Sequence, residues 1–208
     1  MFDPDCRRCP RLASFLDGVK HDYPDYHARP VASFGPKRIE LLIVGLAPGM
    51  HGANATGRPF TGDDSGAMLY QTLYDFGYAT KPVSKSIDDG LKLKKCRITN
   101  VVKCLPPQNK PTMDEIKNCN TFFQQELDEL KQNTVVLALG TIAHNAILRA
   151  LGLKQGKYKF GHGHEHALPN GLWLLDSYHC SRYNTQTKRL TKEMFRGVFA
   201  QAKTLVGA

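Results

Sequence analysis

Short apolar runs recur along the chain, and between them lie longer segments whose apolar residues return every three or four positions. Continuous apolar runs of this length are typical of strands that are buried on both faces of a parallel sheet. Four runs are predicted as strands, at residues 39–47, 96–103, 134–139 and 171–176. Their alternation with helical segments favours the α/β class.

The helical segments have recognisable ends. Thr112 and Glu115 are the two ends of a capping box, which opens a helix, and Gly77 closes an earlier one. Helices are predicted at residues 12–19, 65–76, 112–130, 142–151 and 187–205. Together these elements predict a three-layer α/β/α sandwich with a central four-stranded parallel sheet.

The length of the chain bounds its organisation. A chain of 208 residues can bury roughly 70% of its unfolded surface without cross-links. We expect one domain over residues 1–208, with residues 1–38 as an irregular arm that wraps the core. No apolar run has the length of a membrane span or the form of a secretory signal. We therefore expect a cytoplasmic monomer without membrane contact.

The charge of the chain narrows the class of partner. Its formal net charge is +9, and basic charge favours polyanions because neutralising phosphates releases counterions. Charge alone does not identify a nucleic-acid binder. A nucleotide-binding enzyme is disfavoured, because neither Gly-x-x-x-x-Gly-Lys nor Gly-x-Gly-x-x-Gly follows any predicted strand.

The cysteines suggest a metal centre. Cys6 and Cys9 form a Cys-x-x-Cys near the start, while Cys104 follows a predicted strand and Cys119 lies in a predicted helix. Four thiolates from two distant segments suffice to hold zinc or an iron–sulfur cluster. The alternative is that Cys104 and Cys119 are buried as small apolar residues. Cys96, within a predicted strand, is assigned to the core.

A long loop at residues 45–66 joins the first strand to the next helix. It contains six glycines and two prolines, which suit a backbone that passes close to a ligand. Ligands of open α/β sheets bind at the carboxyl ends of the strands, so this loop is a candidate site. The alternative is an ordinary strand-to-helix connection.

A second candidate loop, at residues 177–191, follows the fourth predicted strand. His179 stands at that strand's carboxyl end, and Ser181, Arg182 and Asn184 could contact phosphates. A loop histidine is often structural, but this one is predicted at the same sheet edge as the glycine-rich loop. Another group, His162, His164 and His166, we interpret as solvated or near phosphate rather than as a metal site.

Three ordered motifs carry a family resemblance. They are Gly45-Leu-Ala-Pro-Gly with Thr56-Gly-Arg-Pro-Phe-Thr-Gly-Asp63, Pro106-Pro-Gln-Asn109-Lys-Pro-Thr, and Tyr178-His-Cys-Ser-Arg-Tyr-Asn-Thr-Gln-Thr. Over nearly the whole chain the sequence resembles family 5 of the uracil-DNA glycosylases, the type-b iron–sulfur enzymes. The resemblance implies that Cys6, Cys9, Cys104 and Cys119 hold a structural [4Fe–4S] cluster, and it favours this cluster over zinc.

Excision of a base requires a flipped nucleotide, a stacking platform and a hydrogen-bond donor to the leaving base. Phe60 is the predicted platform, with core packing as its alternative. The resemblance implies that Asn100 reads the uracil edge and that His179 donates to uracil O2. Gly45 and Ala47 are predicted to form the wall of the base pocket.

Water activation is less well marked. Leu46 and Ala47 occupy positions where other glycosylase families carry an acid or amide, and neither can move a proton. Asp63 and Asn109 are the nearest candidates to position water, although Asp63 could equally cap a helix. Cys180 stands where many superfamily members carry proline, and we expect it to loosen the loop while leaving His179 in place.

These observations predict a monofunctional DNA glycosylase that initiates base excision repair. Its expected substrate is single- or double-stranded DNA containing uracil, and other deaminated or damaged bases such as hypoxanthine. The alternative is a non-catalytic nucleic-acid-binding protein on the same fold, motivated by the missing acid and the charge of +9.

Overall fold

The computed structural model describes residues 2–207 and contains one five-stranded sheet of order β2-β1-β3-β5-β4. Four strands are parallel, as predicted, and the fifth, β4, pairs antiparallel with β5. The strands are β1 (Leu41–Gly45), β2 (Cys96–Asn100), β3 (Val135–Leu139), β4 (Glu165–Ala167) and β5 (Trp173–Ser177). The four predicted parallel strands are confirmed, and β4 adds a fifth that the sequence did not indicate, because it has only three residues and none is fully buried.

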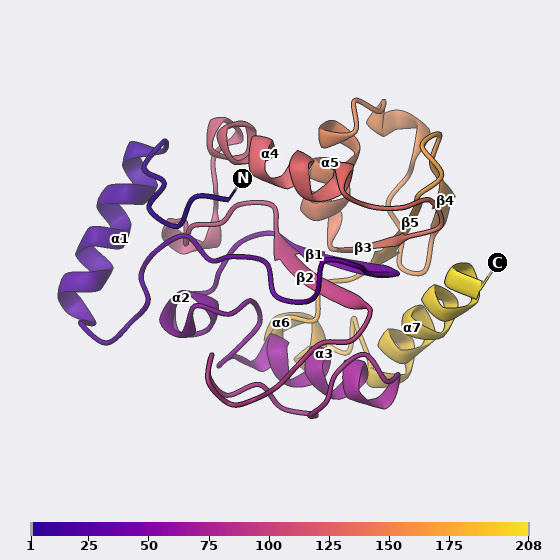
Figure 1. The fold of residues 1–208 in the computed structure, drawn as a ribbon, viewed down its shortest axis with the longest axis horizontal. Coiled ribbons are helices and arrows are strands. Elements are labelled where there is room, and N and C mark those ends of the chain that lie inside the picture. Colours follow the sequence, from indigo (N-terminus) through magenta and orange to yellow (C-terminus); the bar gives the residue numbers. More distant parts are fainter. Residues whose placement is uncertain (1, 208) are drawn as a thin grey trace.

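Helices cover both faces of the sheet, which confirms the predicted three layers. Figure 1 shows α4 and α5 on one face and α3 and α7 on the other. The helices are α1 (Pro10–Asp22), α2 (Ala53–Thr56), α3 (Asp64–Asp75), α4 (Met113–Asp128), α5 (Thr141–Ala150), α6 (Arg182–Gln186) and α7 (Lys192–Gly207), with 3-10 turns at Pro107–Asn109 and Gln155–Lys157.

Alternation along β1 divides the core between the two faces. Leu41 and Ile43 pack with residues of α3 and α7, whereas Leu42 and Val44 pack with residues of α4 and α5. All four are fully buried. Side chains of a strand point alternately to opposite faces, so this pattern explains why the strand is a continuous apolar run.

The bounds of two predicted elements matter for the functional edge of the sheet. The strand expected at 96–103 ends at Asn100, and the helix expected at 187–205 begins only at Lys192 as α7, preceded by the separate short helix α6, which was not predicted. Lys188, between the two helices, has φ of 57°, which a continuous helix does not permit. The break separates a short helix at the functional edge from a long helix that packs in the core.

The amino-terminal arm is fixed to the sheet and to α4. Phe34 forms an antiparallel bridge with Ile98 of β2. Arg11 of α1 makes an ion pair with Glu115 at 2.7 Å, and Glu115 also completes the predicted capping box with Thr112. The predicted capping box is therefore confirmed, whereas the predicted irregular arm contains the regular helix α1. None of the helices within residues 2–207 has the length and apolar character to cross a membrane.

Candidate active site and cysteine pocket

A pocket of about 360 Å³ opens at the carboxyl ends of β1, β2 and β5. It brings together side chains from all three predicted motifs, which are spread over more than 100 residues of the chain. The pocket is lined by Leu46, Ala47, Gly49, Ala53, Phe60, Asp63, Ser65, Asn100, Asn109, His179 and Ser181. The prediction that the glycine-rich loop and the His179 loop share one edge is confirmed.

Phe60 is held rigidly in the floor of this pocket. Its side chain is 7% exposed, and its backbone has φ of 54°. The hydroxyl of Tyr70 donates to the carbonyl of Pro59 at 2.8 Å, which fixes the preceding residue. The ring of Phe60 lies nearly parallel to the imidazole of His179, with centroids 5.9 Å apart. Phe60 therefore belongs both to the core and to the pocket wall.

Gly45, at the end of β1, leaves the space that Phe60 and Asn100 occupy. A Cβ atom on Gly45 would lie 2.5 Å from Oδ1 of Asn100 and 2.8 Å from the Phe60 ring. Both distances are shorter than real Cβ contacts. Glycine is therefore required here by close packing, although Gly45 itself does not line the pocket.

Asn100 presents an unsatisfied amide to the pocket. Its side chain is 3% exposed, and Oδ1 has no hydrogen-bond partner among residues 2–207. A buried polar atom left without a partner costs about 1–3 kcal/mol. A ligand that donates a hydrogen bond at this position would remove that cost.

Asp63 caps α3, so the predicted capping role is confirmed. Its Oδ1 accepts a hydrogen bond from the backbone N–H of Gly66 at 2.9 Å. The other oxygen faces the loop backbone, where a Cβ on Gly52 would stand 2.3 Å from it. Burial raises the pKa of Asp63 and the nearby charge of Asp64 adds to the rise, while hydrogen bonds from backbone N–H groups oppose it. Asp63 also lines the pocket, so its cap role leaves a second role open.

His179 is positioned through its backbone. The side-chain amide of Asn184 donates to the His179 carbonyl at 2.8 Å, and Ser181 caps α6 by accepting from the Asn184 N–H. Burial lowers the pKa of His179 to about 4. The imidazole is therefore neutral near pH 7 and carries one N–H donor.

Cys180 leaves His179 at the pocket, as expected, and its effect on the looseness of this loop stays a prediction. Its side chain is fully buried, and its thiol lies 3.5 Å from the carbonyl of Ser65 at the start of α3. Cysteine packs as a small apolar residue, and here it joins the His179 loop to the glycine-rich loop.

The remaining predicted residues lie at or near the pocket mouth. Asn109 is exposed, with φ of 55°, and the exposed Arg182 lies 3.5 Å from Asp64. Their contacts with DNA stay a prediction, as does that of Asn184, whose amide is engaged with His179. The sequence analysis did not single out Tyr183, whose side chain is 70% exposed on α6. Its neighbours in the sequence are polar, so no pattern distinguished this exposed ring from the rest of the loop.

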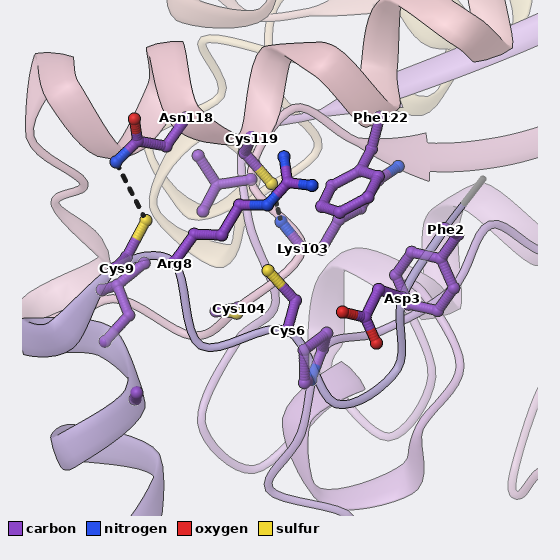
Figure 2. A pocket seen from close by; sticks show the side chains of 14 residues that line it. Phe2, Asp3, Cys6, Arg8, Cys9, Lys103, Cys104, Asn118, Cys119 and Phe122 are labelled. Carbon is purple, nitrogen blue, oxygen red and sulfur yellow. Dashed lines mark hydrogen bonds between the residues drawn. The ribbon is translucent and has the colours of Figure 1, made fainter.

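The four predicted metal-binding cysteines line a second, separate pocket (Figure 2). Cys6 and Cys9 come from the arm, Cys104 from the segment after β2 and Cys119 from α4. The amide of Asn118 donates to Cys9 Sγ at 3.7 Å, and the Lys103 N–H donates to Cys119 Sγ at 3.3 Å. Burial, with smaller effects from the other three thiols, raises the pKa of Cys104 to about 12.

The spacing of these thiols is wide. No three of their sulfur atoms lie within 4.8 Å of one another in the described part of the chain. Thiolates around one tetrahedral zinc ion stand about 3.8 Å apart, given a Zn–S bond of about 2.3 Å. The four sulfur atoms are thus not gathered as closely as they are around a single zinc ion.

Comparisons with known proteins agree with these geometries. The Uracil DNA glycosylase superfamily profile matches residues 32–203. The chain is 47% identical over 207 residues to the Type-5 uracil-DNA glycosylase of Thermus thermophilus, covering 97% of this chain and 94% of the relative. It is 40% identical to the Type-5 uracil-DNA glycosylase of Pyrobaculum aerophilum, covering 98% and 90%.

More distant similarities extend the same pattern. The Type-4 uracil-DNA glycosylase of Pyrobaculum aerophilum is 32% identical over 133 residues, covering 64% of this chain and 60% of the relative. The crystal structure of Pedobacter heparinus SMUG2 superposes with a TM-score of 0.53 at 16% identity, covering 82% of this chain and 77% of that one. At this identity the superposition supports the fold alone.

Proposed function

Because the chain belongs to the uracil-DNA glycosylase superfamily and within it to the type-5 enzymes, we propose how its own residues excise uracil from DNA. The protein is a DNA glycosylase, a hydrolase of the bond between base and deoxyribose that acts in DNA repair. The relatives favour this activity over non-catalytic binding of nucleic acid.

The observation that carries the assignment of residues is the convergence of Phe60, Asn100 and His179 on one pocket. A flipped uracil would stack on the ring of Phe60, which its buried backbone holds in place. The unsatisfied Oδ1 of Asn100 would accept a hydrogen bond from uracil N3–H. The single unpaired acceptor, Asn100 Oδ1, matches the single donor, N3–H, on the base-pairing edge of uracil.

His179 donates a hydrogen bond to the departing base. Breaking the glycosidic bond leaves negative charge on uracil, chiefly on its oxygens and N1. A neutral imidazole with its N–H fixed toward O2 stabilises that charge without itself needing a proton from solvent. Removal of one such preorganised donor typically costs about 3–4 kcal/mol in the barrier.

Asp63 would act on the sugar side of the reaction. An ionised carboxylate at the pocket wall stabilises an oxocarbenium-like sugar and orients the attacking water. Leu46 and Ala47 bring no competing acid or amide into the pocket. Asn109, at the mouth, is the second candidate to hold that water.

The same pocket would admit bases other than uracil. Its wall near Leu46 and Ala47 is apolar and small, and its volume of about 360 Å³ lies within the range of small-ligand pockets. With recognition concentrated on one amide and one stacking ring, hypoxanthine would also bind.

Backbone contacts would come from the rim of the pocket. Ser181, Arg182 and Asn184 begin the short helix α6 beside His179. The net charge of +9 supplies non-specific attraction to phosphates. We infer a monomer that binds one site on single- or double-stranded DNA.

The cysteine pocket fits a [4Fe–4S] cluster better than zinc. Cys6, Cys9, Cys104 and Cys119 would supply the four thiolates that such a cluster takes, and the wide spacing of their sulfur atoms suits a group larger than one ion. Donors to two of the sulfurs, from Asn118 and Lys103, resemble hydrogen bonds to cluster thiolates. Bound there, the cluster would join the arm to α4 as a structural cross-link.

Cleavage of oligonucleotides carrying a single uracil tests the proposal. Single- and double-stranded substrates are incubated with cluster-loaded protein and then treated with alkali, which cuts abasic sites. We expect cleavage by the wild type and by His164→Ala, whose exposed ring is hydrogen-bonded to the Lys159 carbonyl and does not line the active-site pocket, and a loss of about 100- to 1000-fold in His179→Ala.

Unchanged rates in His179→Ala would remove this residue from the mechanism. A parallel substrate carrying hypoxanthine tests the broader base range, and its complete resistance would restrict the enzyme to uracil.

A further inference from the structure

A buried group of three potential metal ligands lies between α5 and the β4 edge of the sheet, and none of its residues lines the active-site or cysteine pocket. His144 comes from α5, His166 from β4 and Asp176 from β5. Their ligand atoms all lie within 4.8 Å of one another. We propose that His144, His166 and Asp176 form a structural zinc site.

The fold places these three side chains on one face of the sheet. His166 pairs with Leu174 in the antiparallel register of β4 and β5, and Asp176 follows Leu174 by two residues. Residues two apart on a strand share a face. Leu174 packs in the cluster that contains α5 residues, so this face is the one toward which His144 projects.

The hydrogen bonds of His144 leave its Nδ1 aimed at a carboxylate. Its Nε2 lies 2.9 Å from the Tyr158 carbonyl, which only accepts, so Nε2 carries a proton. Nδ1 lies 2.7 Å from Oδ1 of Asp176. In the neutral ring these two atoms are both acceptors, so either a second ring proton or a metal cation is required between them. A ligating histidine usually donates its other N–H to a carbonyl or carboxylate in this way.

A proton on Nδ1 of His144 would satisfy its contact with Asp176, but it would leave the ring of His166 without a hydrogen-bond partner. Nε2 of His166 is buried, stands 3.5 Å from Oδ2 of Asp176, and has no hydrogen-bond partner within residues 2–207. One zinc ion would engage His144 Nδ1, His166 Nε2 and the carboxylate together. The metal therefore accounts for both features, whereas a proton accounts for one.

The donor set selects the class of metal. Two imidazoles with one carboxylate suit zinc and its neighbours, whereas magnesium and calcium prefer all-oxygen sites. Ligand atoms around tetrahedral zinc stand about 3.3 Å apart, given bonds near 2.0 Å. The 3.5 Å between His166 and Asp176 is close to this value, and the shorter pair needs to open by about half an ångström.

The position of the site suggests a structural purpose. β4 is a three-residue edge strand with no fully buried side chain, and the metal would fasten it to α5 and β5. Asp176 precedes His179 by three residues, and His162, in the segment leading into β4, accepts from the Tyr178 N–H at 3.2 Å. Zinc would thus steady the base of the loop that carries His179.

Zinc chloride added to the cluster-loaded full chain tests the proposal, with bound zinc measured after desalting. We expect one equivalent of zinc in the wild type and in the control His21→Gln, whose exposed side chain lies in the last turn of α1. His166→Gln should bind more than about 100-fold more weakly, since even indirect partners of a metal are worth 10–100-fold. Zinc should raise the melting temperature of the first two proteins and leave that of His166→Gln unchanged.

Cobalt substitution in the wild type supplies a second test that does not depend on a variant. Cobalt held by nitrogen and oxygen shows weak visible bands, whereas cobalt held by thiolates shows intense near-ultraviolet absorption. Weak bands alone, with one equivalent bound, support the site. Thiolate absorption, zinc binding unaffected by His166→Gln in a protein with native circular dichroism, or no binding at micromolar zinc would each overturn it.

Discussion

Gly45→Ala is expected to disable the base pocket from a position that never touches the base. The added Cβ atom would stand 2.5 Å from Asn100 Oδ1 and 2.8 Å from the ring of Phe60. Ordinary contact of such atoms begins at 3.4 Å. Asn100 and Phe60 would therefore have to move by about 0.5–1 Å to admit the methyl group.

The size of the effect follows from that displacement. Phe60 is confined by its left-handed backbone and by the Tyr70 hydrogen bond to Pro59, so it cannot simply rotate away. A misplacement of about 1 Å at a reacting centre costs on the order of 100-fold in rate. Overpacking of a dense core lowers stability by about 1–3 kcal/mol, which leaves the domain folded at moderate temperature.

Single-turnover cleavage of a uracil oligonucleotide measures the predicted loss, with thermal unfolding followed in parallel. Gly18→Ala is the matched control, because nothing lies within 4 Å of a Cβ built on Gly18 of α1. It should keep the wild-type rate and gain about 0.5–1 kcal/mol from its better helix propensity. A wild-type rate in a folded Gly45→Ala variant would refute the close placement of Phe60 and Asn100.

Other predictions address charge, the gap left by the base, and the cluster. Because burial lowers the pKa of His179 to about 4, this residue is neutral above about pH 5, and single-turnover rates should show no histidine-type inflection between pH 5 and 8; an inflection near 6.5 that disappears in His179→Ala would contradict this. Asp63→Asn keeps the helix cap but removes the carboxylate, so unchanged melting with a rate loss above about 10-fold is expected, and a wild-type rate would leave Asp63 as a cap only. Tyr183→Ala should lower activity on duplex DNA more than on single strands, because exposed apolar side chains wedge into the gap in a duplex, and equal effects on both substrates would exclude this role. Cys119→Ser should abolish the visible absorption of purified protein and lower its melting temperature; retained absorption would exclude Cys119 as a ligand.

Much of the fold could be predicted because it depends on local pattern. The strands β1 and β3 are apolar runs that are buried along their whole length, and the capping box at Thr112 marks α4 without reference to any other element. β4 could not be predicted from pattern, because its Glu-His-Ala sequence gains strand geometry only by pairing with β5. The start of α7 was predicted too early, because Lys188 gives no signal of its positive φ.

The candidate site was predictable to the extent that motifs lie at strand ends. Parallel strands end at one edge of the sheet, so residues after β1, β2 and β5 had to meet there. The contacts that each side chain makes within the site could not be predicted from the spacing of the motifs. Asn184 was predicted at the DNA backbone, and its amide also donates to the His179 carbonyl, while Cys180, in the same loop, is fully buried. Both depend on three-dimensional packing that a single sequence does not reveal.

The pocket has few polar groups, and different residues hold the base and stabilise the charge that develops on it. Gly45 ends a fully buried strand, and Phe60 and Asn100 pack against it, so in the proposed mechanism the base would be held by elements that cost little to order on binding. His179 would then act as a neutral donor in a buried site, where one fixed dipole stabilises developing charge more than it would in water. A protonated imidazole would bind the uracil anion more tightly, but burial disfavours it before the base arrives. Stabilisation by a neutral donor therefore rises only as the leaving base becomes charged, and this makes it selective for the transition state.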